Sequence, residues 1–213
     1  MADPLRLLMI DNYDSFTFNL VHMVRKLPGV ALTITRNDAD FLPDLEAGRY
    51  AGAIISPGPG SAEDTAYFGR NAEMVRRFGP QGLPILGVCL GFQGIFHLFG
   101  GKLKQAPLPV HGKISRLDIR APDPILEGVP DGARVMRYHS IIADTAAGIP
   151  DALEPTAYAA PQPEFAVNGP ELMALRHREL PIFGVQFHPE SFGTDFGQRM
   201  IANFCTLAAA RAA

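Results

Sequence analysis

Residues 84–94 read Pro-Ile-Leu-Gly-Val-Cys-Leu-Gly-Phe-Gln-Gly and place a thiol where a nucleophile could be exposed. Cys89 stands between Gly87 and Gly91, in the spacing of a nucleophile elbow with cysteine in place of serine. Such a strained strand-to-helix turn closes only where the neighbouring residues lack a Cβ. The start of the next helix would stabilise a thiolate, and the backbone N–H of Leu90 would face an oxyanion. The pattern predicts a cysteine nucleophile, with a free cysteine buried in the core as the alternative.

His188 and Glu190 have the types and spacing to supply the base and the orienting group that such a thiol needs. His188 follows the apolar stretch 182–187, and Pro189 holds it in an extended backbone. Two residues apart on an extended chain, both side chains can lie on one side, with Glu190 bonded to one ring nitrogen and the other nitrogen facing Cys89. Taken alone, the pair also fits a strand-end histidine beside a solvated charge. A metal site is less favoured because no third ligand is visible, so the pair with Cys89 predicts a Cys-His-Glu triad.

The loop of residues 57–60 reads Pro-Gly-Pro-Gly and could provide a second oxyanion donor. Glycines allow backbone amides to approach a ligand closely. The glycine-rich patterns of phosphate-binding loops are absent from the chain, so a nucleotide phosphate is not expected here. The composition of the loop fits an ordinary Pro/Gly turn equally well.

Alternation of strand-like and helix-like segments in the first hundred residues predicts an α/β fold. Apolar runs predict strands at 5–10, 30–35, 50–55 and 84–88. Helices are expected after Asp14 or Ser15, with Phe18, Val21, His22, Val24 and the stem of Arg25 on the apolar face, and at 43–47, 67–78 and after the elbow. This order predicts a doubly wound, mostly parallel central sheet flanked by helices. Sites in such sheets form at the carboxyl ends of the strands, where residues 11–15, residues 56–61 and Cys89 would meet.

The second half of the chain predicts a smaller antiparallel portion packed on the same sheet. Strand-like segments occur at 113–119, 133–136, 172–176 and 182–187, and a closing helix at 197–210 carries Cys205 on its apolar face. The Ala/Pro-rich segment 157–169 is expected to be a mobile loop. With 213 residues, 47% of them hydrophobic, residues 1–213 are expected to form one domain.

Charge and composition exclude several classes of function. A net charge of −3 gives no electrostatic footprint for nucleic acid. No apolar run is long enough for a membrane span, and the first residues, Met-Ala-Asp-Pro, are unlike a signal peptide. The two cysteines have no CxxC spacing and no clustered histidines, so we expect reduced thiols, a cytoplasmic location and no structural metal.

Five segments of the chain resemble the class I (triad-type) glutamine amidotransferases, and they occur in family order over nearly its whole length. They are residues 10–17, 55–60, 86–91, 137–140 and 184–191. Residues 10–17, with 111–113, are similar to the branch that holds the glutaminase subunits of anthranilate synthase and aminodeoxychorismate synthase. The branches that serve GMP, CTP or carbamoyl phosphate synthesis are less similar at the N-terminus.

The resemblance implies a role for individual residues. It makes Cys89 the nucleophile, His188 the general base and acid, and Glu190 the orienting carboxylate. It also implies the residues that hold L-glutamine: Gly58, Pro59 and Gly60 in the oxyanion loop, Gln93 as a side-chain contact, and Ser140 and Ile141 as the backbone that grips the α-amino and α-carboxylate groups. Leu90, assigned from the elbow, completes this predicted set.

The resemblance further implies a partner, a chorismate-binding synthase that receives the ammonia. No cofactor is expected in this chain, and any magnesium would belong to the synthase. The chain departs from the family pattern at Phe92, where a histidine is usual, and segment 157–169 looks longer than usual. We expect Phe92 to lie at the seam with the synthase. The alternatives are a glutaminase for another ammonia acceptor, a stand-alone cysteine hydrolase and a catalytically silent scaffold.

Overall fold

The computed structural model describes residues 3–212 and contains a nine-stranded sheet in the order β2-β1-β3-β4-β9-β8-β7-β5-β6. Five neighbouring strands are parallel: β2 (Val30–Arg36), β1 (Leu5–Asp11), β3 (Gly52–Ile55), β4 (Ile85–Val88) and β9 (Ile182–Val185). The remaining pairings are antiparallel and involve β8 (Leu172–His177), β7 (Leu153–Ala159), β5 (Leu103–Ile119) and β6 (Arg134–Ala143). The fold is therefore α/β with a mixed sheet, and its antiparallel portion lies in the second half of the chain, as the sequence predicts.

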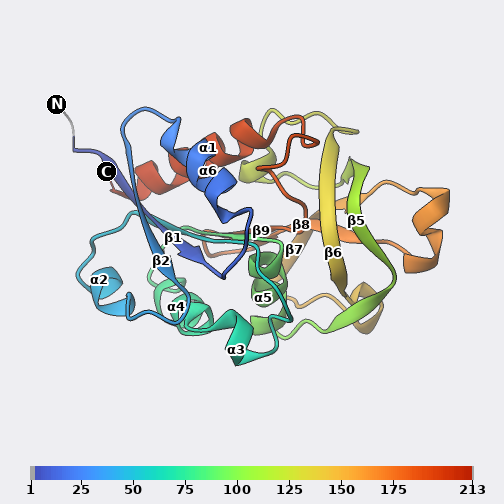
Figure 1. Ribbon diagram of the computed structural model, residues 1–213, viewed down its shortest axis with the longest axis horizontal. Helices are drawn as coiled ribbons and strands as arrows, with labels where there is room; N and C mark the ends of the chain where they lie inside the picture. The colour runs from blue at the N-terminus through green and yellow to red at the C-terminus, as the bar shows by residue number, and fades with distance from the viewer. Residues whose placement is uncertain (1–2, 213) are drawn as a thin grey trace.

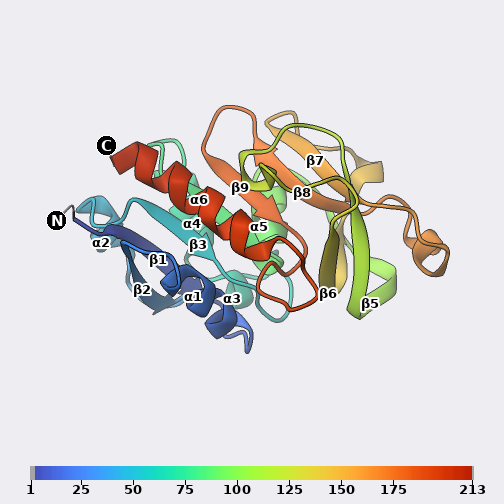
Figure 2. The same ribbon diagram turned by 90° about the horizontal axis from the view of Figure 1, so that it is seen from above.

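Helices cover both faces of the parallel half (Figure 1). On one face lie α1 (Thr17–Arg25) and α6 (Gly197–Ala212), and on the other lie α3 (Thr65–Phe68), α4 (Asn71–Phe78) and α5 (Leu90–Leu98). Figure 2 shows α6 running along the sheet next to α1. A short helix, α2 (Leu42–Glu46), follows β2. None of the helices in residues 3–212 has the length and apolar character that a membrane span requires.

The core strands form because their side chains are apolar on both faces. All four residues of β4 are buried, and so are all four of β3 and of β9. Parallel strands covered by helices on both sides show this continuous apolar pattern rather than alternation. As a result, the carboxyl ends of β1, β3, β4 and β9 meet at one edge of the sheet, where the loops after them come together.

Two expectations for the first half are wrong. The helix predicted at 67–78 is two helices, α3 and α4, because the chain leaves α3 through Gly69 in a left-handed conformation (φ 55°). The first helix begins at Thr17 without a side-chain cap, although Asp14 Oδ1 accepts a hydrogen bond from the Phe16 N–H. Its buried face consists of Thr17, Leu20, Val21 and Val24, so Phe18 (61% exposed), His22 and Arg25 face outward instead of into the core.

The second half contains more regular structure than expected. The β5–β6 hairpin is longer than the segments 113–119 and 133–136, and β7 was not predicted as a strand. Segment 157–169, expected to be a mobile loop, consists of the end of β7 and a 3-10 helix at Pro163–Asn168. Its side chains are anchored: Asn168 exchanges hydrogen bonds with the backbone of Leu108 in β5, and Phe165 is buried. These contacts join distant parts of the sequence, which is why local composition did not reveal them.

Candidate active site

Cys89 lies at the sharp turn between β4 and α5. Its backbone has φ 52°, a left-handed value that a non-glycine residue rarely adopts. The Cys89 N–H donates to the Val185 carbonyl at 2.8 Å, and the Cys89 carbonyl accepts from Gln93 N–H at 3.0 Å. A Cβ on Gly87 would lie 2.5 Å from the backbone of Gly91, so this turn requires glycine. The predicted elbow is confirmed as a strained strand-to-helix turn, with Cys89 6% exposed.

His188 and Glu190 are joined in the interior next to this turn. The Nδ1 atom of His188 lies 2.6 Å from Oε1 of Glu190, and both side chains are almost fully buried. The backbone fixes the histidine, because His188 N–H donates to the Met136 carbonyl at 3.0 Å and the His188 carbonyl accepts from Thr194 Oγ1 at 2.6 Å. Within residues 3–212, the buried Nε2 of His188 forms no hydrogen bond of ordinary geometry, which leaves this nitrogen free for a reacting group.

The protonation of His188 is set by opposing effects. Burial lowers its pKa, but the Coulombic interaction and hydrogen bond with Cys89, and those with Glu190, together raise it more strongly. The pKa of His188 therefore lies well above the usual value of 6.5. This electrostatic coupling requires the sulfur of Cys89 to be a close neighbour of the ring.

A cavity of about 190 Å³ opens beside Cys89. Its walls include the residues that the resemblance assigns to glutamine binding: Gly58, Pro59, Gly60, Gln93, Ser140 and Ile141. Three predicted site residues are not among the residues that line this cavity: Leu90, His188 and Glu190. Leu90 is the first residue of α5 and directly follows Cys89. His111, Tyr138 and His139 also line the cavity and were not assigned to the site from the sequence.

Two glutamines connect the elbow to the far wall of the cavity. Gln93 Nε2 donates to the Ile141 carbonyl at 2.9 Å and to Gln186 Oε1 at 3.2 Å. Gln186 Nε2 in turn donates to Cys89 Sγ at 3.7 Å. Gln186 was not assigned to the site from the sequence, although it lies in the segment 184–191 that carries the family resemblance. This fully buried side chain is a hydrogen-bond donor to the sulfur.

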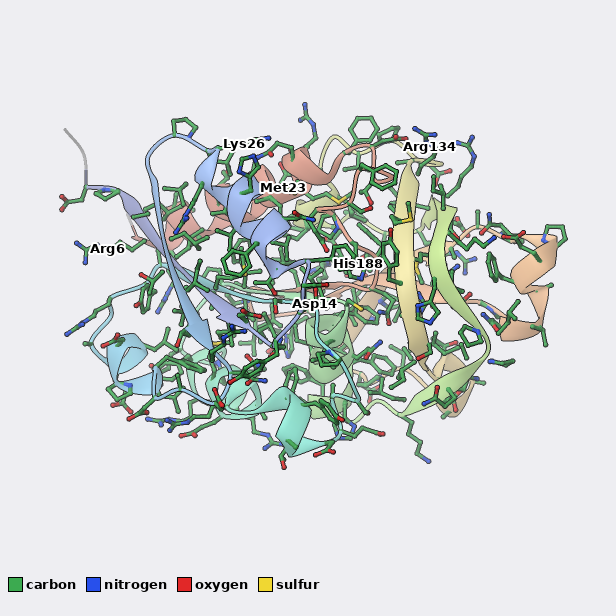
Figure 3. The ribbon with its side chains drawn as sticks, in the orientation of Figure 1. Arg6, Asp14, Met23, Lys26, Arg134 and His188 are labelled. Carbon is green, nitrogen blue, oxygen red and sulfur yellow. The ribbon has the colours of Figure 1, made fainter. Side chains whose placement is uncertain are left out.

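Aromatic rings cover the outer side of His188. The Tyr138 ring lies 5.2 Å from the His188 ring at 86°, and the Phe16 ring stacks on Tyr138 at 5.4 Å. Asp14 is a close electrostatic neighbour of His188, and in Figure 3 the labels of these two side chains lie next to each other. Burial raises the pKa of this carboxyl above its ordinary value. The loop after β1 therefore reaches the base from outside.

His139 is a neutral histidine at the back of the cavity. Burial lowers its pKa well below 6.5, and the charge of Arg137 lowers it further. Arg137 Nε donates to His139 Nε2 at 3.2 Å, so the proton of the neutral ring is on Nδ1. Arg137 is itself fully buried and forms an ion pair with Glu171.

The expectation that Phe92 lies at a surface seam is wrong. Phe92 is 0% exposed and belongs to the core cluster beneath the sheet. The first turn of α5 directs it against β9, where it packs beside Gly184. The residue that replaces the usual histidine is therefore a core side chain.

A family model and individual known proteins both match this chain over nearly its whole length. The family model described as "Glutamine amidotransferase class-I" matches residues 8–208. Anthranilate synthase component 2 of Leptospira biflexa is 41% identical over 207 residues, covering 94% of this chain and 98% of that protein. Aminodeoxychorismate synthase of Streptomyces griseus is 41% identical over 94% of this chain, but only 26% of that protein is covered.

A solved structure also matches over nearly the full length. The crystal structure of a putative GMP synthase protein from Thermoplasma acidophilum superposes with a TM-score of 0.82 and 25% sequence identity, covering 99% of this chain and 96% of that one. Since the family model matches residues 8–208 and the Leptospira biflexa protein matches over nearly the full length of both chains, this chain belongs to the class I glutamine amidotransferases.

Proposed function

We propose that this chain is a glutaminase subunit that hydrolyses L-glutamine to glutamate and delivers the ammonia to a chorismate-aminating synthase. The observation that carries the proposal is the His188–Glu190 pair, buried beside Cys89 on its strained turn. Family membership supports glutaminase chemistry, and relatives named anthranilate synthase component 2 support a chorismate-using partner.

In the proposed mechanism, Cys89 is the nucleophile, His188 the base and acid, and Glu190 the group that orients His188. The sulfur attacks the carboxamide carbon of glutamine, and the carbon–nitrogen bond breaks as His188 gives its proton to the leaving ammonia. Water, deprotonated by His188, then attacks the γ-glutamyl thioester, which releases glutamate and restores the thiol. The balance is glutamine plus water to glutamate plus ammonia.

The oxyanion formed in both steps needs donors that are already in place. The Leu90 N–H is one, because the first N–H groups of a helix have no partner within the helix. A backbone amide of residues 58–60 is the other. Removal of one well-placed donor lowers kcat about 10²- to 10³-fold. Gln93 and the backbone of Ser140 and Ile141, which line the cavity, would hold the amino-acid end of glutamine.

The proposed partner is a separate chorismate-binding synthase that covers the glutaminase site and receives ammonia before it is lost to water. We infer that this chain needs no cofactor and that any magnesium belongs to the synthase. Both thiols are expected to stay reduced, as in a cytoplasmic protein. A glutaminase for another acceptor is the second candidate, and the similarity to a GMP synthase protein favours keeping it.

We further infer that residues 1–213 act as one glutaminase domain built on a doubly wound sheet. The strand order β2-β1-β3-β4-β9, with helices on both faces, corresponds to the flavodoxin-like order of such sheets. Its site lies where the carboxyl ends of β3, β4 and β9 meet.

The test measures glutamate from glutamine with and without the candidate synthases of the same organism, and identifies the chorismate-derived product. We expect low activity for the chain alone, a large gain with the synthase, and either anthranilate or aminodeoxychorismate as product. High activity without any partner would indicate a stand-alone hydrolase. Amination of XMP (xanthosine monophosphate) by a GMP synthase partner, but not of chorismate, would favour the second candidate.

A further inference from the structure

Three buried polar side chains lie behind the oxyanion loop and take no part in the chemistry above. Asn12 follows β1, Ser56 follows β3 and Asn71 begins α4, and none exposes more than 1% of its surface. Asn12 N–H donates to Ser56 Oγ at 2.9 Å, and Asn12 Nδ2 donates to the Ser56 carbonyl at 2.8 Å. Asn71 Nδ2 donates to Asn12 Oδ1 at 2.7 Å. Both ends of the Asn12 carboxamide are thus held.

This network fixes the point from which the oxyanion loop departs. Ser56 directly precedes residues 57–60, and its Oγ also donates to the Pro57 carbonyl at 2.7 Å. Gly58 is wedged between two side chains: a Cβ added there would lie 2.6 Å from Asn12 Cβ and 2.5 Å from Leu90 Cδ2. Asn12 therefore touches the loop on one side, while the residue that follows the nucleophile touches it on the other.

The backbone after Asn12 is itself strained and braced. Tyr13 has a left-handed φ of 62°. Its hydroxyl donates a hydrogen bond to Asp38 Oδ2 at 2.9 Å, and the guanidinium of Arg36 lies 4.4 Å from the centre of its ring. Strained backbone persists only where its surroundings over-determine it. The turn keeps Asn12 inside while Asp14 and Phe16 lead out towards His188.

We propose that Asn12 is a positioning residue: it holds residues 57–60 so that an amide of this loop and the Leu90 N–H reach the same oxyanion. The inference deepens the proposed glutaminase function and rests on it. Within the described chain, Asn12 is not among the residues that line the cavity, so it acts through Ser56 and Gly58 rather than on glutamine. The position of these donors matters because a displacement of a catalytic group by about 1 Å can lower the reaction rate about 10²-fold.

The test is Asn12→Asp in the complex with the synthase. The substitution keeps the shape and the acceptor for Asn71 but puts an oxygen in place of the donor that faces the Ser56 carbonyl. We expect kcat with glutamine to fall about 10- to 100-fold, somewhat less than for the loss of a whole donor. KM for glutamine should stay within about threefold, since uniform binding is not removed. Alkylation of Cys89 by iodoacetamide, which forms no oxyanion, should keep its wild-type rate.

Asn203→Asp is the matched control. Asn203 lies in α6, and its Nδ2 donates to the carbonyls of Ile125 and Glu127 at 3.0 and 2.9 Å, so the chemical change is the same but lies away from the oxyanion loop. Its kcat should remain that of the wild type, even where its thermal midpoint falls as much as that of Asn12→Asp.

Three results would overturn the positioning role: a wild-type kcat in Asn12→Asp, a rise in KM alone, or an equal loss of kcat in Asn203→Asp. A wild-type complex without glutaminase activity would instead overturn the proposed function, and this inference with it.

Discussion

The His188 ring donates to Glu190 from within a three-residue segment, with Nδ1 and Oε1 2.6 Å apart and Pro189 between the two residues. The proline fixes an extended backbone, which brings both side chains to one side of the chain. The carboxylate thereby selects which nitrogen is left for the sulfur. The local sequence therefore determines how His188 is oriented. The distance from His188 to Cys89 depends instead on the pairing of β9 with β4.

The two members of this pair should differ in importance. His188→Asn removes the proton carrier, so we expect nearly all glutamine-dependent turnover to disappear. Glu190→Gln removes an orienting and stabilising group, so its loss should be smaller. Steady-state kinetics of both variants with the synthase tests the order, and a more damaging Glu190→Gln would reverse the assigned roles.

The elevated pKa of His188 should be measurable by NMR titration of its ring. We expect a midpoint above about 6.5 in the wild type and a lower midpoint in Glu190→Gln and in Cys89→Ser, because each variant removes a group whose interaction with the ring raises the pKa of His188. A midpoint at or below 6.5 in the wild type would contradict the coupled arrangement.

The same shift predicts how stability depends on pH. Because the folded protein holds the His188 proton more tightly than the unfolded chain, this stabilisation is complete below the unfolded pKa of about 6.5. It is lost as the pH rises through the higher folded pKa. Denaturant unfolding across this window should show a smaller loss on alkalinisation in Glu190→Gln than in the wild type. Equal slopes would mean that Glu190 does not raise the pKa.

The two thiols should react differently. Cys205 lies in α6, and burial raises its pKa to about 11, so at neutral pH it is protonated and slow. We expect iodoacetamide to modify Cys89 first, as mapped by peptide mass spectrometry, and glutamine to protect it. Preferential labelling of Cys205 would contradict the placement of the reactive thiol.

Phe92 and Phe192 should separate stability from partner binding. Phe92 is fully buried, so Phe92→Ala should reduce the free energy of unfolding by about 3–5 kcal/mol. Phe192 is 93% exposed and lines a surface hollow with Phe16, Tyr138 and Glu190, so Phe192→Ala should leave stability unchanged but weaken activation by the synthase. Chemical denaturation and a titration of glutaminase rate against synthase concentration measure the two effects. An unchanged titration for Phe192→Ala would mean that the synthase does not bind at this hollow.

The features predictable from sequence are those encoded locally. Strand β4 and the elbow follow from a short apolar run and glycines around Cys89, and the pairing of His188 with Glu190 follows from one proline. The parallel strands are easy to find because burial on both faces leaves continuous apolar runs.

The features missed depend on neighbours from distant segments. Strand β7 carries Pro155 and small residues, so its strand state comes from pairing with β5 and β8 rather than from propensity. The burial of Phe92 depends on the rotation of α5 over β9. Gln186 and Asn12 find their partners across the sheet edge, at separations of 97 and 44 residues. No local pattern marks such contacts.

The most direct test of the central claim is Cys89→Ala in the complex with the synthase, assayed once with glutamine and once with ammonium salt. Because the thiol acts only in releasing ammonia, the variant should make no aminated product from glutamine and should make product from ammonium at the wild-type rate. Cys205→Ala, the control, should use both nitrogen sources normally. Glutamine-dependent synthesis that survives in Cys89→Ala would contradict the account.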